Sequence, residues 1–420
     1  MDVRLFPSVL GGSINAIASK SDLHRIMICA ALCDDTVTIE GVTRCADTDA
    51  TASCIEALGA KVVYDGRKCT VTPATKKVEK AILDCGESGS TLRFLLPVAS
   101  VLAKQAEFSG RGKLPQRPIA ELIDVMEKGG VVFLEKTLPI SMSGQIRSGN
   151  YAIMGNVSSQ YISGLLMALA ATEGESFLRL ITPLQSASYV DMTVNTLKLF
   201  GADIEKIPNG FKICGKKKLT SPQNVTVDGD WSNGAFFLSA GAISGSVKVC
   251  GLYSDSAQGD RKITDILSRF GASVIKNGNE ITVSHDKLCG CTVDLTDVPD
   301  LLPVLAVVAS FAEGETRFVG GERLRLKESD RLQTTADMLT ALGGNAHITL
   351  DGITVRTSKL CGGVVDGAND HRIVMAASIA AAYCSGAVTV KGAEAVDKSY
   401  PAFFEDYIKA GGKTDGINLW

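Results

Sequence analysis

Serine, lysine and arginine side chains gather at the expected starts of apolar segments, where they could hold a small anion. The first group is Lys20-Ser21-Asp22-Leu23-His24-Arg25, and the apolar run from Ile26 to Cys33 follows it directly. This stretch contains no Pro or Gly, which predicts a helix whose free amides Ser21 or Asp22 could cap. Free N–H groups at a helix start and the positive end of the helix dipole both favour an anion. Two cations and a histidine in the first turns are more than a structural cap requires.

Five further helix starts resemble the first and keep the same spacing. The six are expected at Ser21, Ser90, Ser159, Ser232, Asp300 and Asp370, at intervals of about 70 residues. A single serine or aspartate at a helix start is usually only a cap. Capping does not explain why cations share one turn of register in this repeat. These cations are Lys20, Arg25, Arg93 and Arg372.

More cations lie outside the helix starts, although the chain as a whole is slightly acidic, with a net charge of −3. Arg117 lies in an expected loop, Lys398 precedes Tyr400, and Lys327-Glu328-Ser329-Asp330-Arg331 forms a charged run. Arginine binds phosphate and carboxylate through its planar fork, so the predicted ligand is small and multiply anionic. Carboxylates set among cations stay ionised at neutral pH and can accept a proton from a hydroxyl. The candidate acids and bases are Asp300, Glu328, Lys20 and Lys398.

A repeated sequence pattern, centred on a glycine, marks where amphipathic helices end and strands begin. Its glycines are Gly59, Gly130, Gly201, Gly271, Gly343 and Gly412. Glycine can take the left-handed conformation that ends a helix. Pairs such as Asn209-Gly210 and Asp415-Gly416 then predict the turn of a hairpin. The bodies behind the six polar starts are apolar on nearly every face, which is typical of helices buried on all sides.

The repeats predict an α/β protein of two inside-out α/β domains. Each domain would hold three βαβαββ-type repeats of about 70 residues, with parallel helices inside and sheets outside. A chain of 420 residues is also too long for one core. The expected domains are residues 1–18 with 229–420, and residues 19–228. A strand from Arg4 to Leu10 is expected to complete a sheet of the first of these domains.

Composition excludes several other classes of protein. Hydrophobic residues make up 45% of the chain and charged residues 21%, which is typical of a globular protein and gives no nucleic-acid signal. The longest apolar stretch, Leu301 to Ala312, is much shorter than the roughly 20 residues that span a bilayer. The N-terminus lacks a signal-peptide core, so we expect a cytoplasmic location. The 12 cysteines include no CxxC pair, and we expect reduced thiols and no metal.

In combination, the motifs resemble the EPSP synthase (3-phosphoshikimate 1-carboxyvinyltransferase) family over essentially the whole chain. They are Lys20-Ser21-x-x-x-Arg25, Gly86-x-Ser88-Gly89-x-Thr91-x-Arg93, Arg117-Pro118-Ile119, Ser158-Ser159-Gln160, Pro299-Asp300, Lys327-Glu328-Ser329-Asp330-Arg331, Asn369-Asp370-His371-Arg372 and Lys398-Ser399-Tyr400-Pro401. The resemblance implies transfer of the enolpyruvyl group of phosphoenolpyruvate to the 5-hydroxyl of shikimate 3-phosphate, with release of phosphate, in aromatic amino-acid biosynthesis. It also implies a cleft between the two domains, and it implies no cofactor. We expect a monomer whose partners are these two small molecules, with no nucleic acid and no membrane.

The resemblance also implies roles for individual residues. Shikimate 3-phosphate would be held by Lys20, Ser21, Arg25, Ser158, Ser159, Ser186, Tyr189, Asp300 and Lys327. Phosphoenolpyruvate would be held by Lys20, Gly89, Arg93, Arg117, Gln160, Arg331, Arg372 and Lys398. Asp300 is the implied base for the hydroxyl. Glu328, with Lys20 or Lys398, is the implied proton donor to the methylene carbon.

Two positions depart from the family pattern, and two alternatives stay open at this stage. Glu87 stands where Asn is frequent and Ser90 where Thr is frequent, so an acid lies beside the expected phosphoenolpyruvate site. One alternative is the related transferase that acts on UDP-N-acetylglucosamine, although the loop from Arg111 to Arg117 lacks the cysteine expected there. The other is a non-catalytic repeat protein that binds an anion. Asp300, Glu328 and Lys398 speak against it.

Overall fold

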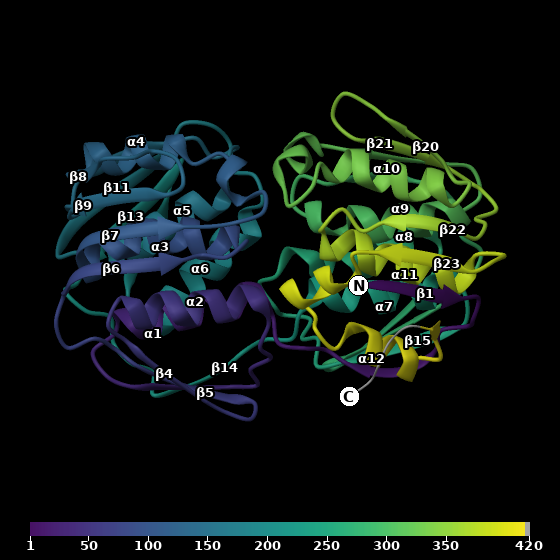
Figure 1. Ribbon diagram of the computed structural model, residues 1–420, viewed down its shortest axis with the longest axis horizontal. Coiled ribbons are helices and arrows are strands. Elements are labelled where there is room, and N and C mark those ends of the chain that lie inside the picture. The colour runs from purple at the N-terminus through teal and green to yellow at the C-terminus, as the bar shows by residue number, and fades with distance from the viewer. Residues whose placement is uncertain (416–420) are drawn as a thin grey trace. The chain divides into compact units, whose positions relative to one another are not determined.

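The computed structural model describes residues 1–415, and the chain divides into two compact units (Figure 1). Unit 1 comprises Met1–Ile17 and the residues from Asp228 onward, whereas unit 2 comprises Ala18–Val227. Each unit contains three four-stranded sheets within the described residues. The expected domains, 1–18 with 229–420 and 19–228, stay a prediction about which parts of the chain fold independently.

Unit 2 alternates strands and helices in chain order. Its strands are β3 (Val37–Glu40), β4 (Lys61–Asp65), β5 (Lys68–Thr72), β6 (Val78–Asp84), β7 (Ala103–Ser109), β8 (Val131–Phe133), β9 (Ile140–Gly144), β10 (Asn150–Ile153), β11 (Gly174–Leu180), β12 (Asp203–Ile207), β13 (Gly210–Gly215) and β14 (Asn224–Thr226). Its helices are α1 (Lys20–Leu32), α2 (Ala46–Ala57), α3 (Gly89–Leu102), η1 (Leu114–Gln116), α4 (Ala120–Lys128), α5 (Ser159–Ala170) and α6 (Ala187–Leu199).

Unit 1 repeats the same alternation. Its strands are β1 (Asp2–Phe6), β2 (Gly12–Asn15), β15 (Ser246–Cys250), β16 (Ser273–Asn277), β17 (Glu280–Ser284), β18 (Thr292–Asp294), β19 (Glu315–Val319), β20 (Asn345–Ile348), β21 (Ile353–Arg356), β22 (Gly363–Asp366), β23 (Val388–Lys391) and β24 (Lys413–Asp415). Its helices are α7 (Trp231–Ile243), η2 (Gly259–Lys262), α8 (Ile263–Phe270), η3 (Pro299–Leu301), α9 (Leu302–Phe311), η4 (Glu322–Leu326), α10 (Arg331–Ala341), α11 (His371–Tyr383), η5 (Ala393–Lys398) and α12 (Phe403–Lys409).

Every described sheet has one parallel strand pair and two antiparallel pairs. In the sheet β6-β7-β9-β8, the parallel pair β6 and β7 flanks the crossover helix α3, and β8 and β9 form the closing hairpin. A second helix, α4, connects the parallel pair to the hairpin. This is the expected βαβαββ repeat, and a parallel pair needs such a crossover because its strands point the same way.

Three of the sheets are completed by strands that are distant in sequence, and in one of them β2 pairs in parallel with β15. Strand β1 lies between β23 and β24, with Val3 opposite Val390 and Leu5 opposite Thr414. The N-terminal strand therefore completes a unit 1 sheet as expected, but it spans Asp2–Phe6 rather than Arg4 to Leu10. In unit 2, β14 pairs in parallel with β3 and completes the sheet of the first repeat.

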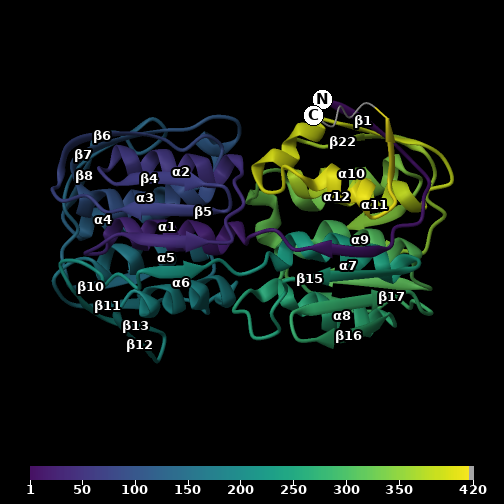
Figure 2. The same cartoon turned by 90° about the horizontal axis from the view of Figure 1, so that it is seen from below.

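The helices behind the polar starts form the interior of each unit. In unit 2, α3 packs against both α1 and α5, and in unit 1, α9 packs against both α7 and α11 (Figure 2). All residues of α7 are buried, as its uniformly apolar sequence predicts. The observed helix starts lie within two residues of the expected ones. The expected cap of α1 was wrong: Ser19, rather than Ser21 or Asp22, accepts a bond from a first-turn amide.

The glycines at the helix ends take left-handed backbone conformations. Gly59, Gly130, Gly201, Gly271 and Gly343 all have positive φ, which explains why a residue without a Cβ recurs there. In the last repeat the positive φ falls on Gly411 instead of Gly412. The turn expected at Asp415-Gly416 extends outside the described residues. Over residues 1–415, every helix is too short or too polar to traverse a bilayer.

Candidate functional site

The start of α1 places two cations and a hydroxyl in the first turns of a buried helix. Lys20 is the first helical residue, and its ammonium lies 2.9 Å from Oδ2 of Asp47 on α2. Both side chains are only 14% exposed, so the pair is largely removed from water. Such a shielded pair is screened less than a surface pair. Asp47 therefore holds Lys20 in one position beside Ser21.

Arg25 is buried and ties three helices together. Its Nε donates to Oγ1 of Thr193 at 2.8 Å, its Nη2 donates to the carbonyl oxygen of Tyr189 at 2.8 Å, and its Nη1 donates to the carbonyl oxygen of Ser21. The guanidinium also lies over the ring of Phe94, 4.9 Å from the centroid. Burial lowers the pKa of Arg25 to about 10, which leaves it a cation at neutral pH.

The start of α3 carries a second cation, held by α5. Nη1 of Arg93 donates to Oε1 of Gln160 at 2.8 Å, and its Nη2 donates to the carbonyl oxygen of Pro118 at 3.1 Å. Nε2 of Gln160 in turn donates to Oγ of Ser90 at 2.9 Å. Ser88 caps the helix, accepting from the amide of Thr91 at 3.2 Å. Two residues implied to hold phosphoenolpyruvate, Arg93 and Gln160, are therefore in direct contact.

Arg117 reaches the same helix start from a loop after η1. A Cβ placed on Gly89 would lie only 2.5 Å from Nη1 of Arg117 and 2.9 Å from its Cζ. Only a glycine leaves room for the guanidinium to lie against the backbone at this position. The free amides of the first turn of α3 and the guanidinium of Arg117 thus face a common region, which favours an anion.

The remaining implied residues of unit 2 lie at the starts of α5 and α6. Ser158 immediately precedes α5 and Ser159 opens it. Ser186 precedes α6 with a φ of 51°, a left-handed conformation that is uncommon for a residue other than glycine. Tyr189 lies in the first turn of α6, where its carbonyl oxygen accepts from Arg25. Side-chain bonds therefore link the start of α1 with α6, and the start of α3 with the start of α5.

In unit 1, Asp300 is the centre of a cluster of cations. One of its carboxylate oxygens, Oδ1, lies 2.6 Å from Nη1 of Arg331 and 3.3 Å from the ammonium of Lys327. Its Oδ2 accepts from Nη2 of Arg372 at 2.9 Å. Burial alone would raise the pKa of Asp300, but Arg372, Lys327 and Arg331 together hold it well below its usual range. The side chain is therefore an ionised carboxylate at neutral pH.

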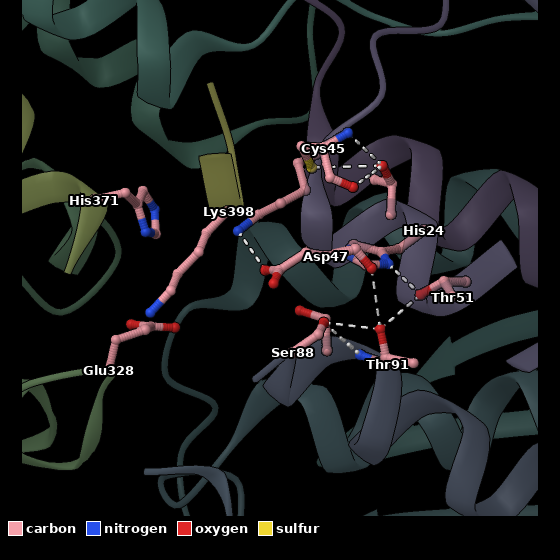
Figure 3. Close-up of polar contacts among 12 residues, drawn as sticks. His24, Cys45, Asp47, Thr51, Ser88, Thr91, Glu328, His371 and Lys398 are labelled. Atoms are coloured by element: carbon pink, nitrogen blue, oxygen red, sulfur yellow. Dashed lines mark hydrogen bonds and ion pairs between the residues drawn. The ribbon is translucent and has the colours of Figure 1, made fainter. Parts of the chain in front are cut away.

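Arg331 joins Asp300 to two other carboxylates. Its Nη2 lies 2.6 Å from Oε2 of Glu328, and its Nε lies 2.8 Å from Oδ2 of Asp370, a fully buried side chain. Burial would raise the pKa of Asp370, but Arg331 lowers it below the usual range. Lys398, at the end of η5, donates to the carbonyl oxygen of Asn369 at 2.7 Å. Figure 3 shows the side chains of Lys398 and Glu328 pointing toward one another.

The structure thus groups the implied site residues within each unit. Those of unit 2 lie at the starts of α1, α3, α5 and α6 and in the loop that carries Arg117. Those of unit 1 lie at η3, just before and at the start of α10, at the start of α11 and at the end of η5. Over residues 1–415, no group of three or more His, Cys, Asp or Glu side chains is arranged to hold a metal ion.

Sequence reasoning missed several residues that support the site. Asp47 pairs with Lys20 from another helix, 27 positions along the chain, and no motif marks it. Thr193 holds Arg25 from the second turn of α6, where it resembles any other residue of an amphipathic helix. Asp260, in η2, is buried and accepts from the hydroxyl of Ser232 at the start of α7. For the contact between Ser232 and Asp260, the sequence offered one indication, the serine at the expected helix start.

Comparisons with known proteins agree with one another. Residues 6–407 match the model of the EPSP synthase (3-phosphoshikimate 1-carboxyvinyltransferase) family. A 3-phosphoshikimate 1-carboxyvinyltransferase from Clostridium novyi is 39% identical, with 99% of this chain and 98% of the relative covered. The relative of the same name from Clostridium acetobutylicum is also 39% identical, over 98% and 97% of the two chains. The solved structure of an EPSP synthase from Acinetobacter baumannii superposes with a TM-score of 0.81 at 25% identity, covering 99% of this chain and 100% of that one.

Proposed function

Because the chain belongs to the EPSP synthase family, we propose how its residues divide the work of the family's reaction. The enzyme transfers the 1-carboxyvinyl group of phosphoenolpyruvate to the 5-hydroxyl of 3-phosphoshikimate and releases phosphate, a step of the shikimate pathway. A new carbon–oxygen bond forms at C2 of phosphoenolpyruvate, and the bond from C2 to the phosphate oxygen breaks. One proton must leave the attacking hydroxyl, and another must be added to the methylene carbon and later removed.

We assign Asp300 as the base that removes the proton of the attacking hydroxyl. Its carboxylate is held by three cations at distances of 2.6 to 3.3 Å, and they keep it ionised at neutral pH. An ionised carboxylate can accept the proton of the attacking hydroxyl once the substrate lies within hydrogen-bond reach. The same cations would stabilise charge that develops on the reacting groups in a site from which water is excluded.

The two substrates would be held by separate sets of side chains. For 3-phosphoshikimate, the proposed residues are Lys20, Ser21, Arg25, Ser158, Ser159, Ser186, Tyr189, Asp300 and Lys327. For phosphoenolpyruvate, they are Lys20, Gly89, Arg93, Arg117, Gln160, Arg331, Arg372 and Lys398. The contact between Arg93 and Gln160 and the close approach of Arg117 to Gly89 support the second set.

Proton transfer to the methylene carbon needs an acid close to phosphoenolpyruvate. We assign it to Glu328, acting with Lys398 or Lys20. The support is that Lys398 and Glu328 point toward one another (Figure 3), which places an ammonium, a group that carries protons, beside the carboxyl group. A neighbouring ammonium would stabilise the negative carboxylate that remains when the carboxyl group gives up its proton.

The direct test is phosphate release from phosphoenolpyruvate in the presence of 3-phosphoshikimate and, separately, of UDP-N-acetylglucosamine. We expect release only with 3-phosphoshikimate. Release only with the sugar nucleotide would overturn the proposed acceptor, and the absence of release with either would favour an anion-binding protein without turnover. The family match does not favour these two alternatives.

The proposed residues are divided between unit 1 and unit 2, so turnover should require both. We propose that the units are separately folding domains and that the enzyme is a cytoplasmic monomer. Residues 19–228 expressed alone should give a folded product with no activity. An unfolded product would count against the domain division. Sedimentation of the full chain at the mass of one 44.2 kDa chain would support the monomer.

A further inference from the structure

Four buried side chains form a continuous hydrogen-bond relay behind the start of α3 (Figure 3). Nδ1 of His24 on α1 lies 2.7 Å from Oγ1 of Thr51 on α2, which lies 2.7 Å from Oγ1 of Thr91 on α3. The hydroxyl of Thr91 lies 2.8 Å from Oγ of Ser88, the cap of that helix. None of the four is more than 1% exposed, so water does not compete for these bonds.

The protonation of His24 sets the direction of the relay. Burial lowers the pKa of His24 well below its usual range, and the nearby charges of Lys20 and Arg25 lower it further, so the ring is neutral. Its Nε2 atom has no hydrogen-bond partner among the described residues. A buried N–H without an acceptor is rare in folded proteins because it loses its hydration without replacement. The single ring proton therefore lies on Nδ1 and is donated to Thr51.

With this direction, each hydroxyl donates toward α3. Thr51 donates to Thr91, and Thr91 donates to Ser88, whose Oγ also accepts the amide of Thr91 at 3.2 Å. Both acceptor positions of the Ser88 oxygen are then occupied, which fixes its rotamer. The proton of Ser88 is left as the donor at the far end of the relay, next to Gly89.

The relay also reaches the partner of Lys20. The Thr91 hydroxyl shares the proton that it donates to Ser88 at 2.8 Å with a second, longer acceptor. This acceptor is the carbonyl oxygen of Asp47, at 3.3 Å, and the side chain of Asp47 pairs with Lys20. Thr51 lies one turn further along the same helix, α2. A displacement of the relay would therefore move both the cap of α3 and the carboxylate that holds Lys20.

We propose that His24 and Thr51 are positioning residues for phosphoenolpyruvate. Neither needs to touch the substrate. Through Thr91 and Ser88 they hold the first-turn amides of α3, and through Asp47 they hold the ammonium of Lys20. This inference rests on the proposed function, because it takes the start of α3 and Lys20 as the phosphoenolpyruvate site.

The first test needs no turnover and so stands apart from the proposed function. In the full chain labelled with ¹⁵N-histidine, the ring nitrogens of the 4 histidines can be observed by NMR, and His24 is identified by its loss in His24→Asn. We expect a neutral ring with its proton on Nδ1 at pH 7.5. A protonated ring, or a proton on Nε2, would overturn the proposed direction.

The second test interrupts the relay at Thr51. Thr51→Val keeps the shape of the side chain and removes the hydroxyl, and it should raise the KM for phosphoenolpyruvate about tenfold, the effect of one lost buried hydrogen bond. The KM for 3-phosphoshikimate should stay within about twofold, and Thr51→Ser should restore both values. Thr316→Val is the matched control, because Thr316 on β19 is equally buried and its hydroxyl has no partner among the described residues. Equal rises in both KM values, or no rise, would overturn the proposal.

A second pair of variants covers a Thr51→Val protein that fails to fold. His24→Asn keeps an N–H donor near the position of Nδ1, whereas His24→Leu removes it. Only His24→Leu should raise the KM for phosphoenolpyruvate, and equal rises in the two variants would overturn the relay. If the wild-type protein releases no phosphate at all, the proposed function fails, while the NMR result still decides the direction of the relay.

Discussion

The guanidinium of Arg117 lies against the backbone of Gly89, so close that a single methyl group on Gly89 would overlap it. The distance from a Cβ at this position to Nη1 would be 2.5 Å. The φ of Gly89 is not in the left-handed region, so packing rather than backbone conformation requires a glycine here. The guanidinium of Arg117 can therefore lie this close to the start of α3 only because Gly89 has no Cβ.

Gly89→Ala should impair substrate binding more than folding. The added methyl group displaces the end of the Arg117 side chain, which can move without shifting the backbone. We expect the KM for phosphoenolpyruvate to rise about tenfold, as for the loss of one charge-assisted hydrogen bond. The free energy of unfolding should change by less than about 1 kcal/mol. Steady-state kinetics and urea unfolding measure the two effects, and an unchanged KM would show that Arg117 does not act at this position.

Arg331→Met should destabilise unit 1. Arg331 is 1% exposed and contacts three carboxylates, so its loss leaves the fully buried Asp370 without its main partner. Removing one member of a buried ion pair typically costs about 3–5 kcal/mol. Arg356→Met is the control, since Arg356 pairs with Glu315 at the surface, where a loss of about 1 kcal/mol or less is expected. Equal unfolding free energies for the two variants would contradict this prediction.

Thr193→Val should weaken the binding of 3-phosphoshikimate. Thr193 accepts from Nε of Arg25 at 2.8 Å, and without it that buried donor lacks a partner. We expect the KM for 3-phosphoshikimate to rise about tenfold. Thr196→Val, in the same helix, removes a hydroxyl that, within residues 1–415, bonds only to the carbonyl oxygen of Met192. A similar KM for the two variants would mean that Thr193 does not orient Arg25 for the substrate.

Asp47→Asn should reduce turnover by freeing Lys20 from its carboxylate partner. The change keeps the size of the side chain but removes the charge that faces the ammonium at 2.9 Å. We expect kcat/KM to fall at least about tenfold. Asp49→Asn, two residues along α2, removes an exposed pair with Arg44 and should leave kcat/KM nearly unchanged. Equal losses of kcat/KM in both variants would mean that a general disturbance of helix α2, rather than the release of Lys20, lowers the activity.

Asp260 should make the stability of unit 1 depend on pH. Burial raises its pKa to about 7, and the charge of Asp300 adds to the rise. An unfolded aspartate titrates near pH 4, so between about pH 4 and pH 7 the folded state binds a proton that the unfolded state does not. The free energy of unfolding should therefore fall as the pH rises through this window, by at most about 1.4 kcal/mol per pH unit.

The measurement compares Asp260→Asn with the wild type, both in a Trp420→Phe background so that emission reports on the buried Trp231. Urea unfolding at pH 5 and pH 7 should show a smaller decrease in Asp260→Asn, because an amide does not ionise. Asp300 and Asp370 act in the opposite sense. Their pKa values are held low in the folded state, so their contribution is lost only as the pH falls below about 4. Equal decreases in the two proteins would exclude Asp260 as the titrating group.

Local patterns in the sequence predicted the repeat, the interior helices and the glycine turns, because each depends on a few neighbouring residues. Which of several adjacent residues caps a helix or takes the positive φ could not be predicted in the same way. Ser19, Ser21 and Asp22 are all good caps, and the path of the preceding chain decides among them, since the amide of Ala18 is held by Thr43. At the last helix end, a Cβ on Gly412 would lie 2.2 Å from Tyr407, so both glycines are needed there, but only Gly411 takes the positive φ.

The supporting contacts of the site were not predictable, because they join residues that are distant in sequence. Lys20 and Asp47 come from different helices, as do His24 and Thr51, and no spacing rule relates them. The motifs indicated which side chains gather at the helix starts. The orientation of each side chain, and therefore its hydrogen-bond partner, follows from how α1, α2 and α3 pack.

The position of β1 between β23 and β24 has a consequence for biosynthesis. Translation proceeds from the N-terminus to the C-terminus, so Asp2–Phe6 is made long before both of its neighbours in the sheet. Unit 2 contains all the strands of its own sheets and can assemble while translation continues. Strand β1 stays without its sheet neighbours until Val388–Lys391 and Lys413–Asp415 leave the ribosome, so unit 1 is completed only after all of unit 2 has been made.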